Sequence, residues 1–160
     1  MSLSVGDRLP EATFKTPTAE GPKPLTTAEV FGGKKVALFA VPGAFTPTCS
    51  DAHLPGFQVR AQEILDKGVD RIACVAVNDF FVLGAWAKAR NIGPEITLLA
   101  DGNGDFTRAA GLELDLSGFG MGKRSSRYAA IVNDGVVEYI GVEPGGDVTV
   151  SSAESVLAQL

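Results

Sequence analysis

The chain is poor in the features that mark secreted, membrane and nucleic-acid-binding proteins. Its 160 residues include two cysteines and one histidine, and 14 basic residues against 19 acidic ones give a net charge of −5. No apolar run approaches the ~18 residues that suggest a bilayer span. The N-terminus, MSLSVGDRLP, lacks the basic start and apolar core of a signal peptide. We therefore expect a soluble, cytoplasmic protein with no membrane partner.

Basic residues are scattered, which argues against nucleic-acid binding because phosphate backbones attract clustered lysine and arginine. The one small cluster consists of Lys123, Arg124 and Arg127, and we predict no nucleic-acid partner. In a reducing compartment, two cysteines are expected to be free thiols rather than a disulfide. The chemistry of each cysteine must therefore be judged separately.

The length of the chain predicts a single domain that spans residues 1–160. The Pro/Gly-rich stretch 16–24 is expected to be a surface loop. Continuous apolar runs at 35–41 and 71–77 are typical of strands covered on both faces. Between them, apolar residues at helical spacing predict a helix over 50–67, ended by Gly68 and kinked at Pro55.

The second half of the chain continues this alternation and then changes to antiparallel strands. An amphipathic segment at 80–90 predicts a helix, and an apolar run at 96–100 predicts a strand. Strands at 128–133 and 136–142 flank Asp134-Gly135, a strong hairpin signal. A last helix is expected from Ser151, because Ser151 and Glu154 have capping-box spacing. This order predicts an α/β fold, a thioredoxin-like three-layer sandwich with a mixed central sheet.

Cys49 lies where a thiol is readily made reactive. It follows a strand and a Pro-Gly turn and stands at the start of the predicted helix, where unpaired N–H groups and the helix dipole favour a thiolate. Pro47 suits a first helical turn, and the hydroxyl of Thr46 or Thr48 could cap it. The alternative is a small, buried, apolar thiol, and position alone does not decide between the two.

The residues around Cys49 carry a family resemblance. The segment VPGAFTPTC at 41–49, followed by HLPGF at 53–57, resembles the peroxidatic segment of peroxiredoxins. Further similarities at 77–79, Trp86, 98–101 and 127–128 extend over nearly the whole chain. The most similar class is the atypical group that includes the plant type II enzymes. The resemblance implies a thioredoxin fold and a peroxidase that reduces hydrogen peroxide and alkyl hydroperoxides without metal or haem.

The resemblance also implies roles for individual residues. Cys49 matches the peroxidatic cysteine, Thr46 the threonine that orients the peroxide, Pro42 the proline that shields the sulfur, and Arg127 the active-site arginine. Such donors are needed because negative charge moves from the sulfur to the departing oxygen during attack. Without the resemblance, Thr46 could be only a helix cap, Pro42 a turn residue and Arg127 a solvated charge. His53 is expected to be a surface or packing residue of secondary importance.

A sulfenic acid formed on Cys49 must be returned to the thiol by a second thiol. In animal members of the group a resolving cysteine precedes the C-terminal helix, but here residues 148–152 read VTVSS. Cys74 matches the second cysteine of plant members, yet its place in the apolar run 71–77 predicts a buried, inert thiol. We predict a one-cysteine cycle with glutathione as reducing cosubstrate, with or without glutaredoxin. Reduction by thioredoxin, with Cys74 as second thiol, is the competing scheme.

Other functions stay open at this point. Cys49 could be oxidised as a signal in a redox sensor or a holdase that does not turn over. A disulfide oxidoreductase is disfavoured, because Thr46 occupies the first position of the Cys-x-x-Cys pattern. The resemblance further implies a homodimer formed through loops near Phe45, Phe80 and Phe119, although these aromatic residues could equally belong to the core.

Overall fold

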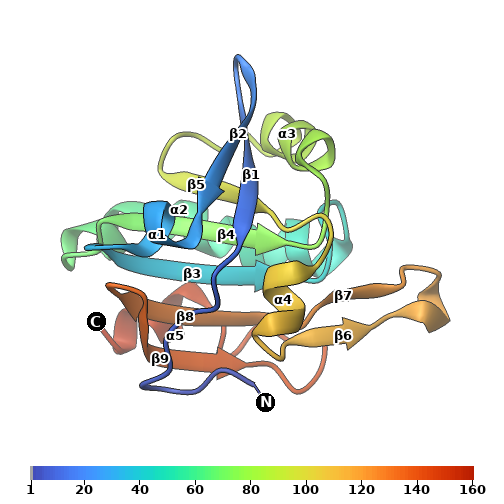
Figure 1. Cartoon of the computed structure of the whole chain (residues 1–160). Helices are drawn as coiled ribbons and strands as arrows, with labels where there is room; N and C mark the ends of the chain where they lie inside the picture. The colour runs from blue at the N-terminus through green and yellow to red at the C-terminus, as the bar shows by residue number, and fades with distance from the viewer. Residues whose placement is uncertain (1) are drawn as a thin grey trace.

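A seven-stranded sheet forms the centre of the computed structural model, which describes residues 2–160 (Figure 1). The strand order is β2-β1-β5-β4-β3-β8-β9. β3, β4 and β5 run parallel, whereas the other neighbouring pairs are antiparallel, so the predicted mixed sheet is confirmed. The strands are β1 Thr13–Thr18, β2 Gly21–Thr26, β3 Lys35–Val41, β4 Arg71–Ala76, β5 Ile96–Ala100, β8 Tyr128–Asn133 and β9 Val136–Val142.

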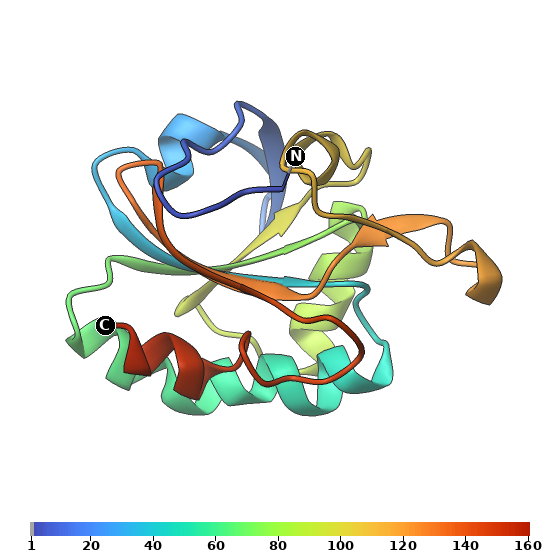
Figure 2. The same cartoon turned by 90° about the horizontal axis from the view of Figure 1, so that it is seen from below.

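Helices cover both faces of the sheet, which gives three layers (Figure 2). One face carries α2 Leu54–Asp66, α3 Phe80–Ala89 and α5 Ala153–Ala158, and the other carries the short helices α1 Thr27–Phe31 and α4 Asp105–Ala109. Each face has its own apolar core, because buried strands send alternate side chains to opposite sides. The predicted three-layer α/β sandwich is confirmed. Within residues 2–160, no helix combines the length and apolarity needed to cross a bilayer.

The hairpin between β8 and β9 forms where the sequence predicts it. Asp134 and Gly135 both have positive φ, 49° and 80°, as the two-residue turn that matches strand twist requires. The Asp134 carboxylate also accepts a hydrogen bond from Gly33 N at 2.6 Å. This hairpin places the residue before β8, Arg127, beside the end of the parallel strands.

Two predicted details are wrong. The stretch 16–24, expected to be a surface loop, forms most of the β1–β2 hairpin. Pro22 and Pro24 are tolerated because β2 is an edge strand whose outer side needs no backbone donors, and Pro17 lies on β1 beyond the pair of Lys15 and Ala100 that joins β1 to β5. The last helix is capped by Ser152 rather than Ser151, since the Ser151 hydroxyl donates instead to Glu143 at 2.7 Å.

A two-stranded ribbon, β6 Glu113–Asp115 and β7 Lys123–Ser125, projects from the body of the molecule near α4 (Figure 1). Phe119 lies between its two strands and is 82% exposed. The ribbon leads directly into Arg127 and β8, so it connects the surface to the functional site.

Candidate active site

The segment that carries Cys49 is a helix start with unusual geometry. Pro47 and Thr48 are already helical, and Cys49–His53 form a π-helical turn that leads into α2. Leu54 N donates to Cys49 O within this turn. Pro55 has no N–H with which to continue the ladder, so the predicted kink takes the form of a change from π to α geometry. π-helical turns of this kind are frequent at functional sites.

Cys49 is fully buried, with 0% of its side chain exposed. Reactive thiols are usually partly exposed, whereas this sulfur lies within the core between the sheet and α2. The thiol is nevertheless not an ordinary apolar core residue. Arg127 Nη2 donates a hydrogen bond to Cys49 Sγ at 3.2 Å, and a charged donor at this distance stabilises a thiolate.

Arg127 is a buried cation, with 6% of its surface exposed, and not the solvated charge that was the alternative. Its Nη1 contacts His53 Nδ1 at 2.9 Å. Its Nε is buried and has no hydrogen-bond partner among residues 2–160. The guanidinium thus orients one N–H toward the sulfur and keeps a further donor for a third group.

His53 belongs to this site, although the sequence assigned it secondary importance. It is 1% exposed, and its Nε2 lies 2.8 Å from the Ser151 carbonyl oxygen. Burial, together with the charge of Arg127, lowers the pKa of His53 to about 4, against opposing effects of the Ser151 carbonyl and Glu143. His53 is therefore neutral at pH 7. The sequence signal that could have placed His53 in the site is its position four residues after Cys49, on the same helical face.

Thr46 and Pro42 lie on the loop between β3 and the helical turn, and both are half-buried. Thr46 Oγ1 donates to Gly43 O at 2.6 Å, so it is not a helix cap, and Thr48 makes no side-chain capping bond within the described chain. Gly43 permits this packing, since a Cβ there would lie 3.2 Å from Thr46 Cγ2 and 3.3 Å from Met121 Cε. A hydroxyl has one hydrogen, so donation from Thr46 to the sulfur requires its rotation.

Cys74 lies in the middle of β4 with 0% exposure, as predicted for a structural thiol. Burial raises the pKa of Cys74 well above its usual value, an effect that the charge of Arg127 only partly opposes. Both cysteines are free. The structure therefore distinguishes a cysteine with a cationic partner from one without.

The aromatic residues expected near a dimer interface are largely on the surface. Phe45 is 51% exposed and Phe119 is 82% exposed, so the core alternative is wrong for both. Phe80 is half-buried and packs against the exposed ring of Phe81, with 4.2 Å between ring centroids.

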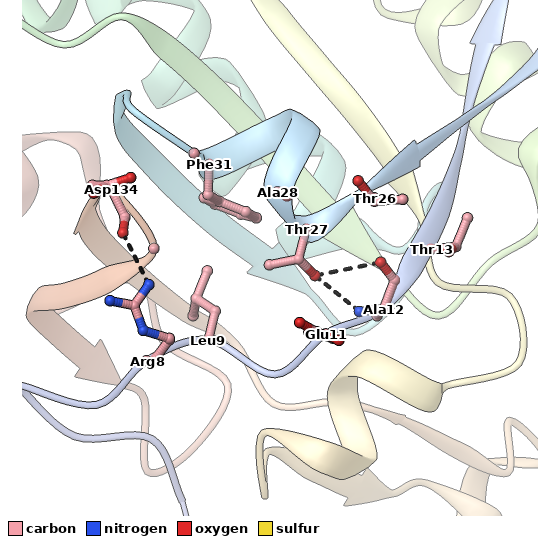
Figure 3. Close-up of a pocket in the computed structure, with 12 residues that line it drawn as sticks. Arg8, Leu9, Glu11, Ala12, Thr13, Thr26, Thr27, Ala28, Phe31 and Asp134 are labelled. Carbon is pink, nitrogen blue, oxygen red and sulfur yellow. Dashed lines mark hydrogen bonds between the residues drawn. The ribbon is translucent and has the colours of Figure 1, made fainter.

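A cavity of about 670 Å³ lies elsewhere, beside α1 (Figure 3). Its lining includes Arg8, Thr27, Phe31 and Asp134, and Arg8 Nη1 donates to Asp134 O at 3.4 Å. Thr27 Oγ1 is occupied by backbone groups of Pro10 and Ala12. Because none of the lining residues is a thiol, this cavity is not the redox site.

Comparisons with known proteins show which family the chain is similar to. The family described as Redoxin matches residues 4–157. The chain is 51% identical over 163 residues to Peroxiredoxin-2E, chloroplastic, from Arabidopsis thaliana, covering 99% of this chain and 70% of the relative. It is 47% identical over 161 residues to Peroxiredoxin-2B from the same plant, covering 99% and 98%.

A solved structure gives the same result. Reduced Prx3 from Vibrio vulnificus in complex with H2O2 has a TM-score of 0.92 and 52% sequence identity, covering 98% of this chain and 94% of that one. The likeness confirms the thioredoxin-like fold and supports a thiol peroxidase. The chain therefore belongs to the redoxin family and, within it, to the peroxiredoxins that include the plant type II enzymes.

Proposed function

We propose that Cys49 reduces hydrogen peroxide and alkyl hydroperoxides as a thiolate, with Arg127, Thr46 and Pro42 completing the site. The observation that carries this assignment is the 3.2 Å hydrogen bond from Arg127 Nη2 to Cys49 Sγ between two buried side chains. A charge-assisted hydrogen bond is strongest where water is excluded.

In the proposed reaction the sulfur gives an electron pair to one peroxide oxygen while the O–O bond breaks. The departing oxygen takes a proton and leaves as water or alcohol, and Cys49 becomes a sulfenic acid. Arg127 Nη2 stabilises the sulfur at the start, and the unpartnered Nε is the donor available to the oxygen on which charge develops. One guanidinium can thus stabilise charge at both ends of the displacement.

Thr46 and Pro42 act on the loop side of the sulfur. Rotation of Thr46 Oγ1 away from Gly43 would let it donate to the sulfur and accept from the peroxide. Pro42 has no N–H and would keep water away. Because Cys49 is fully covered, peroxide enters when loop 42–46 moves, and Phe45, half exposed at a φ of 66°, lies at its tip.

The proposed cycle uses one cysteine of the chain. Glutathione attacks the sulfenic acid, which releases water and leaves a mixed disulfide, and a second thiol from glutathione or glutaredoxin then releases Cys49. The burial and raised pKa of Cys74 support this scheme, because only a thiolate with access to the sulfur can attack it.

Steady-state peroxide consumption tests both parts of the proposal, with glutathione–glutaredoxin and thioredoxin systems compared side by side. We expect Cys49→Ser to be inactive and Arg127→Lys, which keeps the charge but loses the planar fork, to lose roughly 10²-fold in kcat/KM. Activity that survives in Cys49→Ser would refute the assignment. A single equivalent of peroxide consumed per chain would instead indicate the redox sensor or holdase.

Cys74→Ser separates the two reductant schemes. We expect this variant to keep full turnover with glutathione and glutaredoxin. Loss of that turnover would refute the one-cysteine cycle and favour the scheme in which Cys74 is the second thiol and thioredoxin the reductant. We also propose a homodimer through the loops near Phe45, Phe80 and Phe119, where the exposed rings of Phe45, Phe119 and Phe81, which packs against Phe80, supply apolar surface. A monomer in sedimentation equilibrium at micromolar concentration would refute it. The cytoplasmic location stays a prediction.

A further inference from the structure

Glu143, one residue beyond β9, holds the loop that precedes the last helix. It is 7% exposed, and its carboxylate accepts four hydrogen bonds from this loop. Thr149 N and Oγ1 donate at 2.7 and 2.8 Å, and Ser151 N and Oγ donate at 2.8 and 2.7 Å. Burial acts to raise the pKa of Glu143, but the bonds from Ser151 and Thr149 together hold it below its usual value. The side chain is therefore an anion that orders residues 149–151.

Ser151 transmits this order to the active site. While its N–H and hydroxyl bind Glu143, its carbonyl oxygen lies 2.8 Å from His53 Nε2. A carbonyl oxygen only accepts and a guanidinium only donates, so we assign the neutral His53 tautomer with hydrogen on Nε2 and a lone pair on Nδ1. The position of the Ser151 carbonyl thus decides which ring nitrogen faces Arg127.

Arg127 lies at the other side of the His53 ring. Nη1 donates to His53 Nδ1 at 2.9 Å and Nη2 donates to Cys49 Sγ at 3.2 Å, so two bonds fix the guanidinium plane. A backbone hydrogen bond also links Glu143 directly to Arg127, because Glu143 N donates to Arg127 O at 2.9 Å. A substitution of the Glu143 side chain leaves this backbone bond possible and isolates the path through Ser151 and His53.

We propose that Glu143 is a positioning residue for peroxide reduction, which acts through the Ser151 carbonyl and the His53 tautomer to aim Arg127 at Cys49. The inference rests on the proposed role of Arg127. It differs from a purely structural role for Glu143 in one respect. If Glu143 only held the loop 149–151 in place, its substitution would have the same effect whatever residue occupies position 53. If Glu143 positions Arg127, the effect of its substitution on the peroxide rate requires His53.

The test measures two rate constants of Cys49 in the full chain. One is oxidation by hydrogen peroxide, which needs Arg127 at the departing oxygen, and the other is alkylation by iodoacetamide, which breaks no O–O bond. For Glu143→Ala we expect the peroxide rate to fall about 10- to 100-fold, as small misplacements of a catalytic group do. The factor by which the alkylation rate constant falls should be at least fivefold smaller than the factor by which the peroxide rate constant falls. Glu138→Ala, on the exposed side of β9, is the matched control and should change neither rate.

A double-mutant cycle then tests the path. In a His53→Ala background we expect Glu143→Ala to change the peroxide rate less than twofold, because the link is already broken. Equal losses in both backgrounds, or peroxide and alkylation rates that fall together, would overturn the proposal. If Glu143→Ala does not fold, Glu143→Gln takes its place in the same cycle, since it keeps an acceptor for the loop and removes the charge. A wild type that fails to reduce peroxide would refute the proposed function itself.

Discussion

Acidification gives a direct test of the buried pair formed by His53 and Arg127. His53 faces the Arg127 guanidinium, the Ser151 carbonyl and, beyond it, the Glu143 carboxylate, and it also packs against the rings of Phe39 and Phe57. Its neutral form accepts from Arg127 at Nδ1. A proton on Nδ1 would place two donors face to face and add a second buried positive charge. We therefore expect the folded state to resist protonation of His53.

The magnitude follows from the two pKa values. The pKa of His53 falls from 6.5 in an unfolded chain to about 4 in the fold. Between these values only the unfolded chain binds the proton, so the free energy of unfolding is unaffected above pH 6.5 and decreases as the pH falls toward 4. At about 1.4 kcal/mol per pKa unit, the full loss is on the order of 3 kcal/mol.

Urea unfolding at intervals between pH 7 and pH 4.5 measures this loss, with His53→Asn as the comparison. Asparagine can accept from Arg127 through Oδ1 but does not titrate, so the difference in pH slope between wild type and variant isolates His53. The carboxylates with lowered pKa, Glu143 among them, contribute equally to both proteins. Identical slopes from pH 6.5 to 5, or an NMR titration of His53 near pH 6.5 in the folded protein, would refute the reasoning.

Substitutions that test three local features are followed by urea unfolding. Ser50→Ala removes the acceptor of the 3.0 Å hydrogen bond from Trp86 Nε1, leaves this buried N–H without a partner and should cost about 1–3 kcal/mol; an unchanged midpoint would show that this buried bond contributes nothing. Asp134→Ala loses both the bond to Gly33 and a side chain that tolerates positive φ, at a cost of about 1–2 kcal/mol, and Asp134→Gly should lose less. Thr26→Ala removes the capping box of α1 and should cost ~1 kcal/mol, whereas a loss matched by substitution of the exposed Thr13, Thr13→Ala, would not support capping.

The parts of the fold that the sequence predicts well are those with strong local patterns. β3 and β4 are continuous apolar runs that need no neighbour to identify them, and Asp134-Gly135 specifies its hairpin by turn chemistry alone. The β1–β2 hairpin escaped prediction because its prolines and glycine imitate a loop. Pro22 and Pro24 are acceptable because β2 is an edge strand, and Pro17 because the pairing of β1 with β5 is limited to Lys15 and Ala100; both are properties of the assembled sheet.

The active site shows a similar division. The segment around Cys49 is local, and its position at a helix start already raises the hypothesis of a reactive thiol, which the family resemblance then favours. Arg127 lies 78 residues away in sequence, and no periodicity or spacing connects two residues so far apart. Its assignment came from the family resemblance. His53 and Glu143 were missed because their importance depends on the Ser151 carbonyl, a backbone atom whose position no side-chain pattern records.

Cys49 and Cys74 differ in one contact on which the proposed mechanism depends. Both belong to the same core cluster and both have 0% exposure, so burial does not distinguish them. Burial alone favours the neutral thiol, as the raised pKa of Cys74 illustrates. The difference is the guanidinium of Arg127, which donates to Cys49 Sγ and is held by His53. In the proposed mechanism the reactivity of Cys49 depends on this cationic partner, so any change that turns Arg127 away should slow the reaction of Cys49 with peroxide.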